Sequence, residues 1–333
     1  MKIWALSLFF FFIAFNFTNA AKLYIDPQFP KPGQNFTATV DFSDEDYDGD
    51  ITWFIDDKAI GDKSKSIQIR AKKLGKETKI KALISSEAKA PQVLSKTIRP
   101  VLLDVLYEAD TFSPLFFKLA PLNSAGSSIK LHSIVQIPGK DSSKLLYVWK
   151  LNDKKLANAS GIAKKDAYIK LSPFARLANL SLEIRNPKDN RLLAKRYIPI
   201  YIAKNSLDFY VKGLDSTWIF AHSLKDALYL NNKEELLALP FNFSMKSLFD
   251  PVLRWTWSVN GYTIKSEEAN SPYVEVNFTD ENSNEATVRL ETRHKDIFLQ
   301  HADYELKLER GESKNKIIHE ILPGKDESSG FGI

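Results

Sequence analysis

The sequence of 333 residues contains no cysteine. Without thiols the chain can form neither disulfides nor cysteine metal sites, and it has no cysteine nucleophile. Exported animal proteins usually cross-link their small domains with disulfides, so a cysteine-free exported chain favours a bacterial protein. Its domains must then be held together by hydrophobic cores of sufficient size.

Long apolar runs are also scarce. The main one covers residues 3–15, behind Lys2, and small residues suited to cleavage follow at Thr18-Asn19-Ala20. The run is shorter than the roughly 18–20 residues that span a bilayer, so it predicts a cleaved signal peptide at 1–20 rather than a membrane anchor. We therefore expect an exported chain, periplasmic, on the cell surface or extracellular, without a transmembrane segment in its mature part.

The excess of charge of one sign is small. Lysine and arginine number 46 against 41 aspartates and glutamates, a net charge of +5. A dedicated nucleic-acid binder concentrates more positive charge, so no nucleic-acid partner is expected. Residues 58–81 are the local exception, with nine basic and two acidic side chains. Such a run is typical of a solvated sheet face, and the alternative is a patch for an anionic polymer or an acidic protein face.

Sequence signatures of catalysis are missing as well. The chain has no Gly-x-Ser-x-Gly, His-Glu-x-x-His or P-loop motif. A hairpin could gather His294, Asp296, His301 and Asp303 as metal ligands, but their spacing matches no zinc motif. We expect a protein that is not an enzyme.

What the sequence does contain is a threefold pattern around tryptophan. The segments read WFIDDKAI at 53–60, WKLNDKKL at 149–156 and WSVNGYTI at 257–264. Repeats roughly a hundred residues apart indicate whole domains in tandem. In each copy apolar residues alternate around the tryptophan, which is typical of a strand with one buried face. The Asp/Asn/Gly pair that follows favours a tight hairpin turn.

The flanking segments predict further short strands around each tryptophan, and regularly spaced short strands indicate β-sandwiches. Alternating strands are expected before the tryptophans at 34–42, 127–137 and 235–243. We predict an all-β chain of three tandem sandwiches. The predicted domains are 21–101, 102–205 and 206–310, followed by a disordered polar tail at 311–333. Helical signal is thin, and only residues 223–239 could hold one or two helical turns.

The first copy carries a family resemblance. Asp48-Gly49-Asp50-Ile51 comes shortly before Trp53, and Asp56-Asp57 follows the strand. This segment resembles the PKD and related immunoglobulin-like repeats of bacterial surface proteins, whereas the later copies match only from the tryptophan to the turn.

The resemblance implies three tandem immunoglobulin/PKD-like β-sandwich domains. It also implies a non-catalytic exported interaction or spacer protein of the bacterial cell envelope, which mediates adhesion or protein binding. The alternative is a carbohydrate-binding accessory protein of the envelope. The expected partner is accordingly an envelope protein or a polysaccharide.

An acidic loop in the first copy begins like a calcium site. Asp44, Asp46, Asp48 and Asp50 alternate with other residues, and Gly49 occupies the glycine position of such loops. Position twelve, however, is Ile55 rather than a bidentate glutamate. Two interpretations stay open: a calcium site whose coordination is completed by a carboxylate from a neighbouring loop or domain, or a solvated acidic turn. No other cofactor is expected.

Aromatic residues outside the repeat are candidates for sugar stacking. Trp218 is not aligned with the tryptophans of the pattern, and neither are Phe112, Phe116 and Phe117. Trp218 is the candidate ligand-binding residue if it is exposed. Otherwise these side chains would pack a joint between domains.

Overall fold

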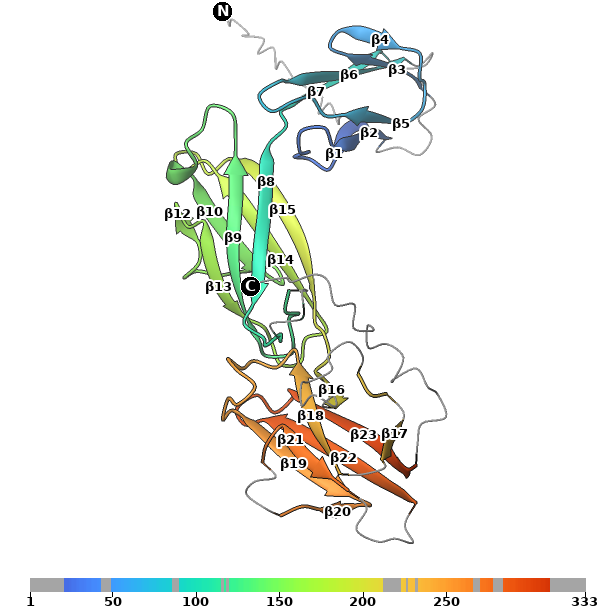
Figure 1. Ribbon diagram of the computed structural model, residues 1–333. Coiled ribbons are helices and arrows are strands. Elements are labelled where there is room, and N and C mark those ends of the chain that lie inside the picture. Colours follow the sequence, from blue (N-terminus) through green and yellow to red (C-terminus); the bar gives the residue numbers. More distant parts are fainter. Residues whose placement is uncertain are drawn as a thin grey trace, which may run out of the picture. The chain divides into compact units, whose positions relative to one another are not determined.

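The computed structural model of the protein is shown in Figure 1. It describes residues 21–42, 49–85, 90–114, 117, 120–211, 223–225, 227–230, 233–265, 270–277 and 284–311. The chain divides into two compact units. One comprises Met1–Asp104, Ile134–Tyr147 and Glu183–Arg196, and the other Val105–Ser133, Val148–Leu182 and Tyr197–Ile333. The domain boundaries drawn from the sequence stay predictions.

The first group of strands forms two sheets. The order in the first sheet is β1 (Ala21–Asp26), β2 (Asn35–Phe42), β5 (Ser66–Arg70). The order in the second is β4 (Lys58–Ile60), β3 (Asp50–Ile55), β6 (Thr78–Ser85), β7 (Gln92–Ile98). Alternate residues of these strands are buried in one apolar cluster, in which Phe36, Trp53 and Ile80 have at most 1% of their surface exposed.

The second group repeats this arrangement. One sheet has the order β13 (Asp166–Lys170), β9 (Ser128–Gln136), β8 (Leu102–Ala109). The other has the order β11 (Lys154–Lys155), β10 (Leu146–Leu151), β14 (Leu177–Arg185), β15 (Leu192–Tyr201), and β12 (Gly161–Ile162) pairs with β10. A 3-10 turn, η1 (Ser142–Lys144), precedes β10.

The third group contains the edge strand β17 beyond its seven principal strands. One sheet has the order β16 (Ser206–Val211), β18 (Glu234–Phe241), β21 (Tyr273–Val276). The other has the order β17 (Ala227–Leu230), β23 (His301–Arg310), β22 (Glu285–His294), β19 (Leu253–Val259), β20 (Tyr262–Thr263). Strand β17 runs parallel to β23, whereas the other strand pairs of this group run antiparallel.

One strand order is therefore built three times. The first, second and fifth principal strands of each group form one sheet, and the third, fourth, sixth and seventh form the other. Two such sheets around a tryptophan-bearing third strand are the arrangement of immunoglobulin-like sandwiches. The predicted fold class, an all-β chain of tandem immunoglobulin-like sandwiches, is confirmed.

The repeated tryptophans have the same role in each group. Trp53, Trp149 and Trp257 are all 0% exposed. Each indole N–H donates to a backbone carbonyl just before the fifth strand: Ser64 at 2.8 Å, Lys164 at 3.0 Å and Ser271 at 2.8 Å. A buried indole needs an acceptor for its N–H, and this bond anchors the fifth strand to the core.

The hairpin turns after the tryptophan strands also match. Both central residues have positive φ in every copy: Asp56 and Asp57, Asn152 and Asp153, Asn260 and Gly261. A type I′ turn requires this conformation, which Asp, Asn and Gly tolerate best. The first side chain of each turn also accepts a bond from a backbone N–H of the sixth strand, at Lys79, Asn179 and Thr287. The turn residue thus also ties two strands together.

One local expectation was wrong. Residues 223–239 contain no helix in their described part, where β17 and the start of β18 lie instead. Leu236–Phe241 is buried at every position, because β18 is the central strand of its sheet and is covered on both faces. A run that is apolar on both faces has no strand periodicity, so its sequence is also compatible with a helix.

Candidate functional site

Most residues singled out from the sequence as ligand sites lie outside the described residues. This holds for Asp44, Asp46, Asp48 and Trp218. Asp50 is described: it begins β3, is exposed, and lies opposite Ser85 of β6. The calcium site and the sugar-stacking tryptophan therefore stay predictions.

Of the histidine and aspartate pairs near the C-terminal strands, His294 is held by the backbone through both ring nitrogens. The Nδ1 atom of His294 accepts the backbone N–H groups of Asp296 (3.0 Å) and Ile297 (3.1 Å), so Nε2 carries the proton and donates to the Ser244 carbonyl (3.0 Å). Both ring nitrogens are thus used by the backbone. Within the described ranges, no group of three histidine, aspartate or glutamate side chains could hold a metal ion.

Phenylalanines of the loop after β8 pack against the third group of strands. Phe112 lies on the core around Trp257, and its N–H donates to the Phe243 carbonyl at 2.7 Å. Phe117 meets the Phe241 ring edge-on, with 5.3 Å between centroids. These contacts support the packing interpretation for Phe112. Phe117 contacts Phe241 but is 42% exposed, and Phe116 lies outside the described residues.

The basic run at 58–81 is partly paired within the chain. Lys72 Nζ lies 2.7 Å from Asp56 Oδ2, and Lys81 Nζ lies 5.3 Å from the centre of the Phe54 ring. The hydrogen bond from Lys72, together with that from the Lys79 N–H, lowers the pKa of Asp56. These contacts favour the solvated sheet face over a patch dedicated to an anionic polymer.

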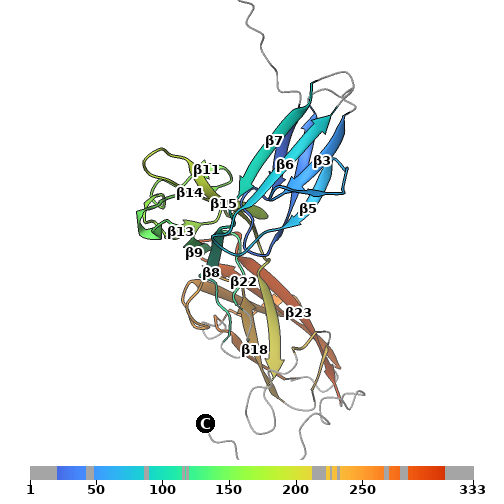
Figure 2. The same ribbon diagram turned by 90° about the horizontal axis from the view of Figure 1, so that it is seen from above.

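A groove of about 620 Å³ lies on the sheet β13-β9-β8, whose strands neighbour one another in both views (Figures 1 and 2). It is lined by Leu106–Glu108 of β8, Lys130–His132 of β9 and Asp166–Tyr168 of β13. These segments are distant in the sequence, and only the pairing of the three strands brings them together. Sequence reasoning missed this groove.

Strand alternation decides which side chains the groove displays. Leu131 and Ala167 are buried beneath it, at 2% and 8% exposure. Their neighbours point the other way, so that Asp166 lies opposite His132 and Tyr168 opposite Lys130 across the β9–β13 pair. The signal in the sequence is the alternation of Ala167 and Ile169 around Tyr168, which is typical of a strand.

The groove combines large apolar surface with mixed charge. Tyr168 is 61% and Leu106 58% exposed. Tyr107, 47% exposed, alternates to the face of the buried Leu103 and Ala109. His132 Nδ1 lies 2.6 Å from Asp166 Oδ1, and both side chains are more than half exposed, at 54% and 76%. Water screens such a pair, so it adds little to stability and leaves both groups accessible to a partner.

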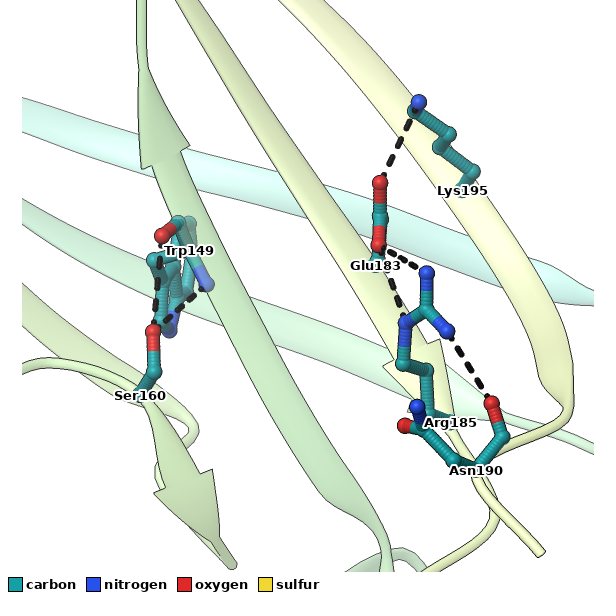
Figure 3. A network of polar contacts seen from close by, with 6 residues as sticks. All are labelled: Trp149, Ser160, Glu183, Arg185, Asn190 and Lys195. Carbon is teal, nitrogen blue, oxygen red and sulfur yellow. Dashed lines mark hydrogen bonds and ion pairs between the residues drawn. The ribbon is translucent and has the colours of Figure 1, made fainter. Parts of the chain in front are cut away.

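The buried carboxylate of Glu183 is held by two basic side chains of the same chain (Figure 3). Glu183, whose side chain is 4% exposed, accepts from Arg185 Nε at 3.0 Å and Nη2 at 2.7 Å. Lys195 Nζ lies 3.2 Å from its other oxygen, and Arg185 also donates to the Asn190 carbonyl. The figure also shows Ser160 Oγ accepting from the Trp149 N–H at 3.0 Å. The Glu183 contacts are structural, because a carboxylate held by two cations is not available for proton transfer. The Ser160 contact is a structural bond to the backbone of β10.

Asp208 is one of two described carboxylates, with Glu234, whose environment disfavours the charged form. It lies on β16 opposite Leu239, which is 3% exposed. Burial raises the pKa of Asp208, and Lys225 offsets only part of that effect. Because the pKa of Asp208 is higher in the folded chain than in the unfolded chain, protonation of Asp208 favours the folded state. This stabilisation is fully present below the unfolded pKa and is lost as the pH rises through the folded pKa.

We therefore predict that Asp208→Asn increases the free energy of unfolding at pH 7 and leaves it unchanged near pH 3. Urea denaturation at both pH values measures the effect. Asp153→Asn is the matched control, because it removes an exposed carboxylate at a turn position that tolerates asparagine. An equal effect of Asp208→Asn at both pH values would contradict the burial argument.

Comparisons with known proteins do not assign the chain to a family. No protein-family model matches the chain, and no curated protein matches it. The three N-terminal domains of the bacteriophage RB49 outer capsid protein Hoc are similar over 88% of this chain and 99% of that one, with 11% identity and a TM-score of 0.24. The fibronectin(III)-like modules of Clostridium thermocellum CbhA match over 54% and 94%, with 9% identity and a TM-score of 0.25.

A third similar structure is Bacteroides ovatus SGBP-B in complex with a mixed-linkage heptasaccharide. It matches over 87% of this chain and 70% of that one, with 12% identity and a TM-score of 0.22. TM-scores this low carry no argument about this chain, whose fold rests on its own strand order. In the part of the chain that the structure describes, no helix has the length and apolar character needed to cross a membrane.

Proposed function

We propose that the chain is a non-catalytic, exported interaction protein of the bacterial cell envelope, in which PKD-like immunoglobulin modules hold a protein-binding face. The observation that carries this proposal is the groove on β13-β9-β8, where Tyr168 and Leu106 are exposed on the two outer strands and the charged groups of β9 lie between them. The signal-peptide pattern at 1–20 supports export.

The chemistry of the groove suits a protein partner. Protein interfaces place tyrosine and aliphatic side chains at their centre and polar groups around them. Here Lys130, His132, Asp166 and Glu108 supply both signs of charge around the exposed apolar surface. Mixed charge selects partners through electrostatic complementarity. The exposed His132–Asp166 pair lacks the burial that catalytic groups use, which favours binding over catalysis.

We predict that Tyr168→Ala weakens binding of the purified chain to isolated envelopes of the producing cell about tenfold, the effect of losing roughly 1.4 kcal/mol at an interface centre. Co-sedimentation measures the bound fraction. Tyr262→Ala is the control, because Tyr262 is 82% exposed on β20 and outside the groove. Equal loss in both variants would contradict a role for the groove.

Two further arms of the same experiment test the partner and the acidic loop. Protease treatment of the envelopes should abolish binding if the partner is a protein, and binding that survives it would favour the polysaccharide alternative. Chelation should abolish binding only if Asp44, Asp46, Asp48 and Asp50 hold a calcium ion that binding requires. An absence of any binding would contradict the envelope role.

A further inference from the structure

We infer that the outer face of β15 is a second binding site, and that its ligand is a neutral polysaccharide. The site is a line of three exposed side chains, Tyr197, Pro199 and Tyr201, which we name the tyrosine strip. Tyr197 is 62% and Tyr201 72% exposed, and Pro199 between them is exposed as well. It shares no residue with the groove on β13-β9-β8.

The strip follows from strand alternation. In β15 the residues between these three, Ile198 and Ile200, face the interior, and Ile200 is 0% exposed. Residues two apart therefore share the outer face. At about 3.3 Å per residue, the two tyrosines are about 13 Å apart with the proline midway. This gives an apolar line long enough for several sugar rings.

The neighbouring strand adds an apolar and an amide side chain beside Tyr201 and Pro199. The turn at 186–191 makes β14 and β15 an antiparallel hairpin, and its register is given by the bond from the Ile202 N–H to the Arg176 carbonyl (3.2 Å). This register puts Leu177 beside Tyr201 and Asn179 beside Pro199. Leu177 is 44% exposed, and Asn179 is exposed too. The strip therefore offers stacking surface and an amide.

These properties fit a neutral sugar chain better than the other candidates. Sugar rings present apolar C–H faces to an aromatic ring and hydroxyls to an amide, and neither needs a charged partner. A protein interface needs a broad patch with a polar rim, whereas the strip and its two neighbours on β14 form a narrow band of five side chains. A second copy adding a strand at this edge would meet Pro199, which has no N–H to donate.

The lysine and arginine that precede the strip in β15 do not change this assignment. Lys195 lies beside Tyr197 on the same face, but its ammonium is paired with the buried Glu183 at 3.2 Å. Arg196 alternates to the other face. An anionic polymer would therefore find no cation within the strip. The proposal rests on the strip alone and does not depend on a protein partner in the groove.

Affinity electrophoresis of the full purified chain tests the inference. The chain has a pI near 9.0, so it is run towards the cathode in an acidic native gel. The probes are hydroxyethylcellulose and galactomannan as neutral polymers, and polygalacturonate as an anionic one. We expect at least one neutral polymer to retard the wild-type chain. Tyr197→Ala and Tyr201→Ala should each weaken that retardation about tenfold, which corresponds to the loss of one stacked ring.

The controls separate binding from folding. Tyr262→Ala and Tyr168→Ala should be retarded like the wild type, because these tyrosines lie outside the strip, and Tyr201→Phe should also bind because it keeps the ring. Retardation of the wild type by neither neutral polymer, or by polygalacturonate alone, would overturn the inference. So would undiminished binding by the Tyr197→Ala/Tyr201→Ala double variant, with thermal unfolding confirming that each variant is folded.

Discussion

Trp257→Ala should destabilise the third sandwich by about 3–5 kcal/mol, the usual cost of truncating a fully buried tryptophan. Trp257 is 0% exposed and stacks on Phe209, with 5.5 Å between ring centroids and 18° between planes. Its N–H also binds the Ser271 carbonyl, so the change leaves both a cavity and a buried carbonyl without its partner. Domains are stable by only about 5–15 kcal/mol, so this loss is a large share.

Guanidinium denaturation followed by near-ultraviolet circular dichroism measures the effect. Trp257→Phe should cost distinctly less, because it preserves the ring stack and removes only the indole N–H and part of the volume. Tyr262→Ala, at 82% exposure, should change stability little. If Trp257→Ala unfolded at the same denaturant concentration as Tyr262→Ala, the tryptophan would not be the centre of this core.

Gln300→Leu should cost about 2–4 kcal/mol, because it leaves several buried polar groups without partners. Gln300 is 0% exposed. Its Nε2 lies within hydrogen-bond distance of Ser124 Oγ (2.9 Å), the Ala125 carbonyl (2.9 Å) and Ser244 Oγ (3.0 Å). Its Oε1 accepts from the Ser244 N–H at 2.8 Å. One amide therefore joins three chain segments that are distant in the sequence.

Two measurements test this role. Chemical denaturation gives the free energy of unfolding, and hydrogen exchange of the Ser244 amide should become faster in Gln300→Leu because its acceptor is gone. Gln68→Leu is the matched control, because Gln68 is exposed on β5 and should change stability by no more than about 0.5 kcal/mol. Unchanged exchange at Ser244 together with unchanged stability would contradict the prediction.

The sites differ in how far the sequence could reveal them. The tyrosine strip is local, since Tyr197, Pro199 and Tyr201 alternate within one strand, and such alternation is typical of a strand. Its exposure was not predictable, because apolar alternation alone does not say which face of a sheet is covered. The groove could not be predicted either, because Leu106, His132 and Asp166 meet only through strand pairing.

The sequence by itself determined the all-β class, the three tryptophan strands and the turns that follow them. These features depend on interactions between near neighbours: alternation at period two, and the positive φ that Asp, Asn and Gly accept at positions such as Asp56 and Asn260. Only the tertiary structure decided that β18 is a strand buried on both faces, that Gln300 joins distant segments, and that a groove lies on β13-β9-β8. The physical reason is that register and burial on a sheet are set by partners far along the chain.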